Sequence, residues 1–306
     1  MALNKNLEVS ELRAGSILEL MREIVILFRP SQYVKNVFIF APLLFSFAFT
    51  VSNFVNALIA FLLFSMMASS IYIFNDLMDI EEDKRHPVKK NRPITRGAVS
   101  SGIAKFLILL LFLVSVSTSF FLNRALMTVL LIYFGLNLAY SLKLKHIAIV
   151  DIAIIASGFV LRLFAGSVVT GINLSVWIIT ITFLLALFLA LAKRRDDILL
   201  ASAGNHTRKN IDGYNIEFIN IAMSLMAGVI IVIYILYTLS PEAVGKTNNS
   251  YLYVTTLFVI LGIFRYMKIT FVDRKSGNPT EIVLKDIFLQ VTIVLWFTTF
   301  IGLVLF

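Results

Sequence analysis

The stretch VNALIAFLLFSMMASSIYIFNDLMDIEEDKRHP occupies residues 55–87 and joins a run of apolar residues directly to a highly charged segment. A bilayer core about 30 Å thick is crossed by roughly 20 helical residues, so residues 55–74 suit a membrane-spanning helix. The whole chain agrees, because 59% of its 306 residues are hydrophobic and only 15% are charged. An ordinary soluble domain is about a quarter charged. This composition excludes a disordered chain and argues against a soluble enzyme.

Nine apolar segments of spanning length are predicted along the chain. They cover residues 37–53, 55–74, 104–122, 125–142, 147–169, 174–192, 217–239, 251–270 and 283–305. These segments are apolar all round and do not alternate in polarity, so they are helices and not the strands of a barrel. We therefore expect an all-α polytopic membrane protein. A cytosolic N-terminal segment with an interfacial helix (residues 1–36) precedes a nine-helix transmembrane domain (residues 37–306).

Basic residues are distributed very unevenly between the two sides that nine spans define. With the N-terminus in the cytosol, 24 of the 27 Lys and Arg residues are cytosolic. Only Arg124 and Lys246 are outside, and Arg162 lies within a span. Because cytosolic loops carry an excess of Lys and Arg, this predicts an inner (plasma) membrane protein with its N-terminus inside and its C-terminus outside. Nearly all of the soluble chemistry then faces the cytosol.

Three aspartates stand where the second span meets the cytosol. Asp76, Asp79 and Asp83 are spaced i, i+3 and i+7, which places them on one face of a helix. Carboxylate oxygens are hard ligands that suit Mg²⁺, and neighbouring cations can bind phosphate oxygens, so together they favour a Mg²⁺ ion that is shared with a diphosphate. Asn75 could add an amide oxygen. The alternative is a solvated acidic helix end, which would not require the basic residues of the same loop. These are Lys84, Arg85, Lys89, Lys90, Arg92 and Arg96.

A second charged cluster, Lys193-Arg194-Arg195-Asp196-Asp197, stands at the cytosolic end of the sixth span. Arginine suits bidentate phosphate binding and lysine acts as a point charge. Asp196 and Asp197 could bind a second metal ion or orient Lys193 and Arg194. The alternative for the basic residues is a positive-inside anchor of the helix.

The fifth span contains two ionisable residues, Asp151 and Arg162. Their spacing brings them within about 20° of one helix face, with Arg162 about 16 Å deeper. Charges inside a span are costly and usually functional, so Arg162 could seat an anionic head group; the alternative is a structural ion pair or a hydrogen-bonded arginine. Further polar residues near cytosolic helix ends are Gln32, Lys35, Asn36, Asn137, Tyr140 and Lys143. Lys35 and Lys143 are candidate phosphate ligands.

The acidic pattern Asn75-Asp76-x-x-Asp79-x-x-x-Asp83 in a nine-helix protein resembles the UbiA superfamily of intramembrane prenyltransferases. Further matching stretches are Arg29-Pro30-x-Gln32-x-Val34-Lys35-Asn36, Arg85-His86-Pro87-x-Lys89-x-x-Arg92-Pro93-Ile94, Leu144-Lys145-His146, Ser157-Gly158-Phe159-x-x-Arg162-x-x-Ala165-Gly166, Leu174-Ser175-x-Trp177, Lys193-Arg194 and Arg265-Tyr266. The combined set resembles the branch that acts on decaprenyl phosphate as a phosphoribosyltransferase.

The resemblance implies a UbiA-type bundle and transfer of 5-phosphoribosyl from phosphoribosyl pyrophosphate to a polyprenyl phosphate, for synthesis of lipid-linked pentose and cell-wall polysaccharide. It implies Mg²⁺ at Asn75, Asp76, Asp79 and Asp83, of which Asp76, Asp79 and Asp83 are the expected catalytic residues. Substrate contacts are expected from Lys35, Tyr72, Asn75, Arg85, Arg92, Tyr140, Lys143, Arg162, Lys193 and Arg194. The expected partners are these two substrates and the bilayer, with no nucleic acid; a homo-oligomer is compatible with the resemblance.

Two other functions stay open at this point. An aromatic-acceptor prenyltransferase of the same fold would use the same carboxylates for a prenyl diphosphate. Such enzymes have a fuller second aspartate motif than Asp196-Asp197, which favours the phosphoribosyl branch and leaves a second metal ion open. A transporter also carries charges within its spans. However, the charges gather at one membrane face and no inverted repeat is evident.

Overall fold

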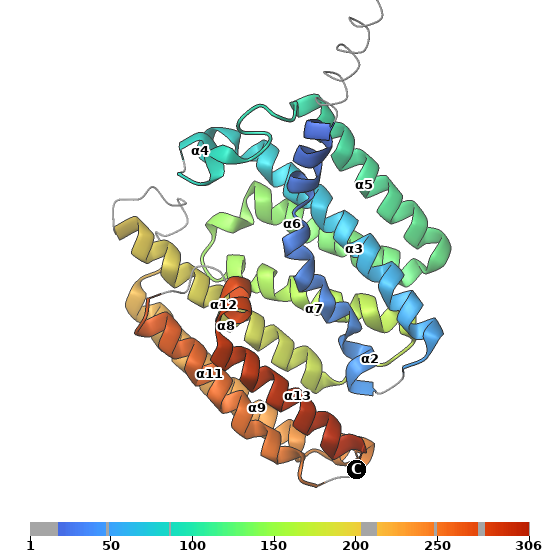
Figure 1. The fold of residues 1–306 in the computed structure, drawn as a ribbon, viewed down its shortest axis with the longest axis vertical. Helices are drawn as coiled ribbons and strands as arrows, with labels where there is room; N and C mark the ends of the chain where they lie inside the picture. Colours follow the sequence, from blue (N-terminus) through green and yellow to red (C-terminus); the bar gives the residue numbers. More distant parts are fainter. Residues whose placement is uncertain are drawn as a thin grey trace, which may run out of the picture. The chain divides into compact units, whose positions relative to one another are not determined.

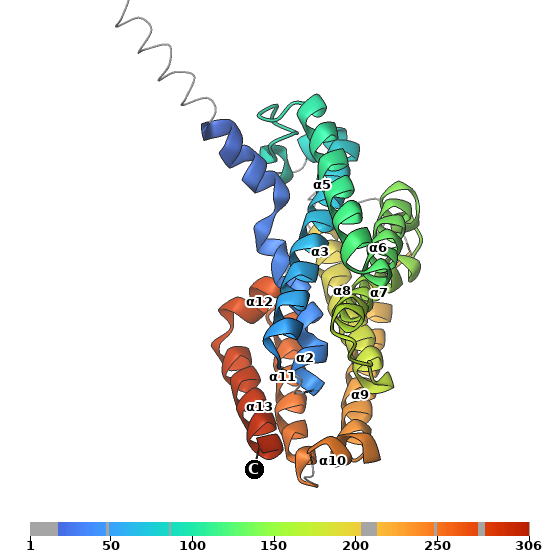
Figure 2. The same cartoon turned by 90° about the vertical axis from the view of Figure 1, so that its right-hand side faces the viewer.

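The computed structural model describes residues 18–46, 49–85, 87–202, 213–247, 250–274 and 279–305. Every regular element in those ranges is a helix (Figures 1 and 2). The α-helices are α2 (Ala41–Ser46), α3 (Val51–Met78), α4 (Ile80–Arg85), α5 (Ser101–Leu122), α6 (Arg124–Leu142), α7 (Val150–Thr170), α8 (Val176–Ser202), α9 (Ile216–Thr238), α10 (Pro241–Thr247), α11 (Thr256–Phe271), α12 (Pro279–Lys285) and α13 (Ile287–Leu305). The 3₁₀-helices are η1 (Pro30–Phe40), η2 (Lys89–Asn91), η3 (Leu144–His146) and η5 (Leu252–Thr255).

Eight helical segments among the described residues are long and apolar enough to cross a membrane. They are α3, α5, α6, α7, most of α8, α9, the joined η5 and α11, and α13. Polar caps mark where several of them begin. The side chains of Thr50, Ser100 and Asn215 accept hydrogen bonds from backbone N–H groups in the first turns of α3, α5 and α9. The predicted all-α, multi-pass class is confirmed.

The first predicted span, residues 37–53, is not one continuous helix. Its beginning belongs to the 3₁₀-helix η1, which runs directly into the short helix α2. Pro42 has no N–H to donate, which interrupts the α-helical hydrogen bonding at this point. Ala41 N–H instead bonds to Phe38 O in the tighter 3₁₀ pattern. Residues 47 and 48 lie outside the described residues, and a ninth spanning helix stays a prediction.

The chain divides into two compact units, and each is described by itself. Unit 1 comprises residues 1–141 and 161–172, and unit 2 comprises residues 142–160 and 173–306. In unit 1, α3 packs along α5 and η1, and small residues line its contacts. Ser70 Oγ donates to Ile108 O at 3.3 Å, and Ser115 Oγ donates to Leu63 O at 3.2 Å. Hydroxyls and small side chains are the usual means by which membrane helices associate.

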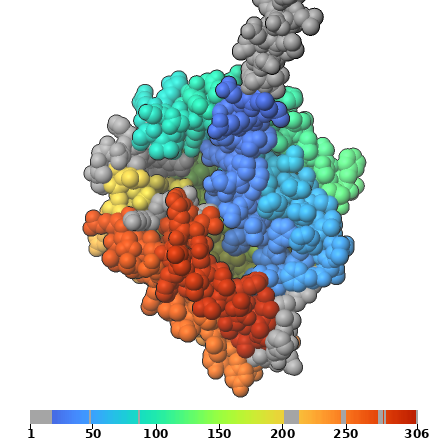
Figure 3. All heavy atoms as spheres, in the orientation of Figure 1, coloured from blue at the N-terminus to red at the C-terminus, as the bar shows by residue number. Residues whose placement is uncertain are grey.

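The 3₁₀-helix η1 is placed by close backbone contacts within unit 1. Residues 18–46, in dark blue, lie beside α3, in lighter blue, on the face shown in Figure 3. Gly166, on the part of α7 that belongs to unit 1, approaches η1 so closely that an added Cβ would lie 1.9 Å from Ile39 O. Only glycine permits this approach. The position of η1 matters because Arg29, the residue before it, reaches the acidic motif.

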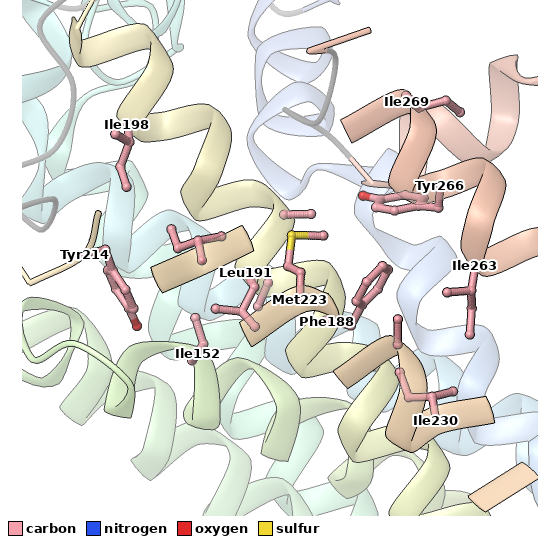
Figure 4. Packing of buried hydrophobic residues seen from close by; sticks show 14 of the residues in the cluster. Ile152, Phe188, Leu191, Ile198, Tyr214, Met223, Ile230, Ile263, Tyr266 and Ile269 are labelled. Atoms are coloured by element: carbon pink, nitrogen blue, oxygen red, sulfur yellow. The ribbon is translucent and has the colours of Figure 1, made fainter. Parts of the chain in front are cut away.

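The core of unit 2 lies among α8, α9 and α11. Figure 4 shows Phe188, Met223 and Tyr266 meeting there, and all three side chains are buried. Helix α8 packs on α9, and α11 packs on α13. Arg265 Nη2 forms an ion pair with Asp286 Oδ2 at 2.7 Å, which joins α11 to the start of α13. This packing fixes the end of α8 that carries the second charged cluster.

Candidate active site

The acidic motif keeps a helical spacing although α3 ends within it. Asp79 is the C-cap of α3, and α4 begins at the next residue. The i to i+4 pattern nevertheless continues, because Asp79 N–H bonds to Asn75 O at 3.0 Å and Asp83 N–H bonds to Asp79 O at 2.8 Å. Asp76 and Asp83 are buried, each 1% exposed, whereas Asp79 is half-buried. Two of the three carboxylates are therefore withdrawn from water.

Two arginines neutralise the buried carboxylates. Arg92 Nη1 lies 2.9 Å from Asp76 Oδ1 and 2.5 Å from Asp83 Oδ2, so one nitrogen contacts both side chains. Arg29 Nη2 makes a second ion pair with the same Asp76 oxygen. The shared contact confirms that Asp76 and Asp83 face the same way, as their spacing predicts. Burying a carboxylate is costly unless it is paired in this manner.

Arg29 is a member of this cluster that the sequence analysis did not assign. Its backbone is left-handed, with φ 54° and ψ 59°, a conformation that is uncommon for a residue other than glycine. Its guanidinium lies 5.3 Å from the centre of the Tyr72 ring, within range of a cation–π contact. Burial lowers the pKa of Arg29, and the Asp76 carboxylate acts in the opposite direction. The only sequence signal was its place in the Arg29-Pro30-x-Gln32 stretch.

Asn75 is held from a different helix of unit 1. Ser141 Oγ, at the end of α6, donates a hydrogen bond to Asn75 Oδ1. The same hydroxyl contacts Asn137 O at 2.7 Å. These contacts fix the direction of the Asn75 amide one residue before Asp76. Nothing in the spacing of Ser141 predicts this role, since the two residues are 66 positions apart.

Arg162 lies in the interior of unit 1 and is 4% exposed. Its Nε donates to Asn36 Oδ1 at 2.8 Å, and its Nη2 lies 3.3 Å from the Tyr133 hydroxyl. The guanidinium also lies over the rings of Phe64 and Tyr133, at 4.8 and 5.1 Å from their centres. Asn36 in turn donates to Ser65 Oγ at 2.8 Å. These contacts favour the hydrogen-bonded structural alternative; binding of a lipid phosphate stays a prediction.

In unit 2, Asp151 is the centre of a buried polar network. Arg194 Nε donates to Asp151 Oδ2 at 2.6 Å, and Arg194 Nη1 lies 2.7 Å from Asp197 Oδ2. The Tyr214 hydroxyl donates to Asp151 Oδ1 at 2.6 Å and accepts from Ile149 N–H at 2.6 Å. Burial, together with the hydrogen bond to Asp151, raises the pKa of Tyr214. Asp151 therefore has Arg194 as its ion-pair partner. Arg194 also contacts Asp197, which agrees with one of the two roles predicted for Asp197, the orientation of Arg194.

Strain accompanies this network. Ile149 has φ 71°, which is a genuine outlier for a β-branched residue. Such conformations cost of order 1–3 kcal/mol and persist only where the surroundings hold them. The hydrogen bond from Ile149 N–H to Tyr214 supplies part of that restraint. A Cβ at Gly213 would lie 2.6 Å from Ala148 Cβ, so this backbone approach also requires glycine.

The neighbours of Arg194 differ sharply in exposure. Lys193 is exposed, and Asp196 is half-buried. Arg195 is 5% exposed; its Nε donates to Asn220 Oδ1 at 2.9 Å, and its Nη1 donates to Thr270 O at 2.7 Å. Arg195 thus joins α8 to α9 and α11. Of the three basic residues, Lys193 is the exposed one.

The remaining predicted residues are placed as follows. Arg85 and Lys143 are exposed, and Lys35, Tyr72 and Tyr140 are half-buried. Lys143 belongs to unit 2 and precedes η3, whereas the other four belong to unit 1. His86 lies outside the described residues. Unit 1 therefore gathers Arg29, Asn75, Asp76, Asp83 and Arg92 into one cluster, and unit 2 gathers Asp151, Arg194, Asp197 and Tyr214 into another.

The donor chemistry of the unit 1 cluster suits a divalent cation. Within the described ranges, no three Asp, Glu, His or Cys side chains lie close enough to hold a metal ion alone. Mg²⁺ does not require three, because it usually binds one or two carboxylates and takes further oxygens from water and substrate phosphates. Asp76 and Asp83 already share one cationic group, Arg92. The oxygen donors are thus compatible with a magnesium ion.

The fold and these two clusters define a multi-pass membrane protein whose carboxylates and cations gather near helix ends. The profile of the UbiA prenyltransferase family matches residues 37–305. The chain belongs to the UbiA prenyltransferase family, as its motifs suggest.

The chain is also similar in sequence to named relatives and similar in fold to solved structures. The chain is 32% identical to the decaprenyl-phosphate phosphoribosyltransferase of Mycolicibacterium smegmatis, over 95% of each chain. It is 33% identical to the enzyme of that name from Corynebacterium glutamicum, over 88% of this chain and 82% of the relative. The structure of a UbiA homologue from Archaeoglobus fulgidus bound to DMAPP and Mg²⁺ has a TM-score of 0.66 at 17% identity, over 91% of this chain and 97% of that one. A UbiA homologue from Aeropyrum pernix K1 has a TM-score of 0.64 at 16% identity, over 87% and 98%.

Proposed function

We propose that this protein is a glycosyltransferase that moves 5-phosphoribosyl from phosphoribosyl pyrophosphate to a polyprenyl phosphate. The observation that carries the proposal is its similarity, over 95% of both chains, to an enzyme named decaprenyl-phosphate phosphoribosyltransferase. An oxygen of the lipid phosphate attacks C1 of the ribose, and the bond from C1 to the pyrophosphate oxygen breaks. The products are pyrophosphate and a lipid-linked phosphoribose. The lipid-linked phosphoribose serves the synthesis of cell-wall polysaccharide.

The chemistry places modest demands on proton transfer. The lipid phosphate is already ionised, so the attack needs no strong general base. The main requirement is stabilisation of the negative charge that develops on the departing pyrophosphate. The Asp76–Asp83 cluster, with Arg29 and Arg92 beside it, supplies both carboxylates for a cation and guanidinium groups for phosphate oxygens.

Asp76 and Asp83 would hold Mg²⁺ directly, and Asn75 and Asp79 are the further oxygen donors that the resemblance implies. When bound, the ion supplies electrostatic stabilisation of the pyrophosphate leaving group. Asp76 and Asp83 are positioned by their burial and by Arg92, and Asn75 is oriented by Ser141. Tyr72 supports Arg29 through its ring. These contacts order the oxygen donors before substrate arrives, which reduces the reorganisation needed during the reaction.

Lys193 is proposed to contact the soluble donor. Replacing Lys193 by Gln is expected to raise KM for phosphoribosyl pyrophosphate by about 10-fold, the lower end of the range for one charge-assisted contact. KM for the lipid phosphate is expected to change little, because Lys193 is exposed and suited to a ligand from water. Steady-state kinetics with each substrate varied in turn measures both constants. Lys105→Gln is the matched control, since Lys105 is also exposed; equal effects of the two variants would reject the assignment.

We further propose nine membrane crossings, with η1 and α2 providing the first. Eleven 3₁₀ residues and six α-helical residues extend about 31 Å at roughly 2.0 and 1.5 Å per residue, which matches a bilayer core of about 30 Å. The N-terminus and the loops that carry both charged clusters then lie in the cytosol of a cell whose inner membrane holds the protein. The C-terminus lies outside.

This topology has a direct test, because the chain contains no cysteine. Single cysteines at Lys90 and Asn173, which are both exposed, are expected to react with an impermeant thiol reagent from opposite sides of the membrane. Three predicted spans separate them, α5, α6 and α7. Labelling of sealed inverted vesicles and intact cells distinguishes the sides. Reaction of both positions from the same side would overturn the arrangement.

The proposed reaction is tested with purified protein, labelled phosphoribosyl pyrophosphate, Mg²⁺ and a panel of polyprenyl phosphates. We expect a labelled lipid product and stoichiometric pyrophosphate, with both lost on chelation of the metal. Lack of transfer to every lipid phosphate, combined with transfer from a prenyl diphosphate to an aromatic acceptor, would instead support the alternative enzyme. Movement of a solute across the membrane without release of pyrophosphate would support a transporter.

A further inference from the structure

The two arginines at the acidic motif contact the oxygens that a divalent cation would need. Arg92 contacts Asp76 and Asp83 through one nitrogen, and Arg29 contacts Asp76. We propose that Arg29 and Arg92 are exchangeable counter-ions. They neutralise Asp76 and Asp83 until a divalent cation takes these carboxylates, and they then bind the pyrophosphate group of the metal-bound donor. The second half of this inference rests on the proposed function.

Competition for the carboxylates follows from the contacts. Arg92 Nη1 is 2.9 Å from Asp76 Oδ1 and 2.5 Å from Asp83 Oδ2. A cation that binds these oxygens must displace the guanidinium or share the oxygens with it. Two positive groups so close together repel each other strongly, because the site is largely withdrawn from water. Each arginine must therefore weaken metal binding when no anion is present.

The layering of the cluster indicates what the displaced arginines meet. The side chains of Asp76 and Asp83 are each 2% exposed, whereas those of Arg29 and Arg92 are 27% and 23% exposed. An anion that arrives from water therefore reaches the guanidinium groups before it reaches the carboxylates. Guanidinium groups bind phosphate oxygens in a bidentate manner. Arg29 is aimed by its left-handed backbone and by the Tyr72 ring, and both features persist if its ion pair opens.

The two halves of the proposal predict opposite changes in binding affinity for one variant: tighter binding of the metal ion and weaker binding of pyrophosphate. Arg92→Gln removes a cation that competes with the metal, so Mn²⁺ alone should bind several-fold tighter than to wild type. The same variant loses a phosphate contact, so pyrophosphate at saturating Mg²⁺ should bind about 10- to 100-fold more weakly. Electron paramagnetic resonance of free Mn²⁺ measures the first constant, and titration calorimetry with pyrophosphate measures the second, both on the full chain in detergent.

Lys90→Gln is the matched control, because Lys90 lies in the same loop, carries the same charge and is exposed. It should leave both constants near the wild-type values. A purely structural Arg92 predicts that pyrophosphate binds equally well or better in the variant, and that result would overturn the proposal. Unchanged or weaker Mn²⁺ binding by a variant that melts like wild type would overturn it as well.

If Arg92→Gln does not fold, Arg29→Gln provides the same test. This variant leaves Arg92 bridging both carboxylates, and tighter Mn²⁺ binding with weaker pyrophosphate binding is again expected. Failure of the proposed function has a different signature, since it would abolish ribosyl transfer by the wild type while both binding constants and their opposite shifts remain.

Discussion

Asp76→Asn is expected to lower the rate of phosphoribosyl transfer by a factor on the order of 100 to 1,000, the cost of losing one major electrostatic group from an active site. Asp76 is buried, and one of its oxygens accepts ion pairs from both Arg29 and Arg92. Asparagine has nearly the same shape but no charge, so it removes an anionic metal ligand and leaves the two arginines with one anion fewer. Initial rates across a series of Mg²⁺ concentrations measure the loss.

Glu82→Gln is the control for this variant. Glu82 lies next to Asp83 on α4 and is exposed, so the same loss of charge should leave the rate close to that of wild type. Added Mg²⁺ should recover little of the activity of Asp76→Asn, because a ligand is missing and not merely weakened. Wild-type turnover by Asp76→Asn at limiting Mg²⁺ would refute the role of Asp76 as a metal ligand.

Arg194→Gln is expected to destabilise the protein by about 3–5 kcal/mol, the usual cost of breaking a buried ion pair. Arg194 and Asp151 are 4% and 1% exposed and lie 2.6 Å apart. The variant leaves the Asp151 carboxylate with Tyr214 as a hydrogen-bond donor but without its cation. Thermal unfolding of the purified protein, followed by loss of helical circular dichroism, should show a clear drop in Tm.

A double variant separates this stability effect from substrate binding. Asp151→Asn combined with Arg194→Gln removes both charges, so it should recover part of the lost stability. Lys193→Gln, one position away but exposed, should leave Tm unchanged while raising KM for the donor. A melting temperature for Arg194→Gln equal to that of Lys193→Gln would show that the ion pair contributes nothing. Arg194 is accordingly a poor probe of donor affinity and Lys193 a better one.

Local spacing predicted the acidic motif well, because residues seven apart must share a face of any helix. It could not identify the arginines that reach Asp76, since Arg29 lies 47 positions away and arrives through a left-handed turn. Likewise, the common face of Asp151 and Arg162 was inferred from helical periodicity alone. Periodicity says which way a residue points but not what lies opposite, and the partner of Asp151 is Arg194, 43 positions away.

The membrane spans show the same division between local and distant information. Eight of the nine predicted segments are long apolar helices among the described residues, because apolar length alone determines whether a helix can cross a bilayer. The first segment differed because proline and the 3₁₀ pattern changed its local geometry, which a hydropathy count does not register. Tyr214 was missed for another reason: its hydroxyl acts on Asp151 from 63 positions away, and no local pattern marks it.

The close approach of Gly166 to Ile39 makes one point of the chain unusually sensitive to evolutionary drift. At Gly135 or Gly228 an added methyl group would enter open space, so a change to alanine there would not move neighbouring residues. At Gly166 it would meet a backbone carbonyl, which cannot rotate away as a side chain can. Replacement of Gly166 by any larger residue therefore requires η1 itself to move, and Arg29 would move with it. One methyl group in the apolar interior would thus alter the charge balance at the carboxylates without touching them.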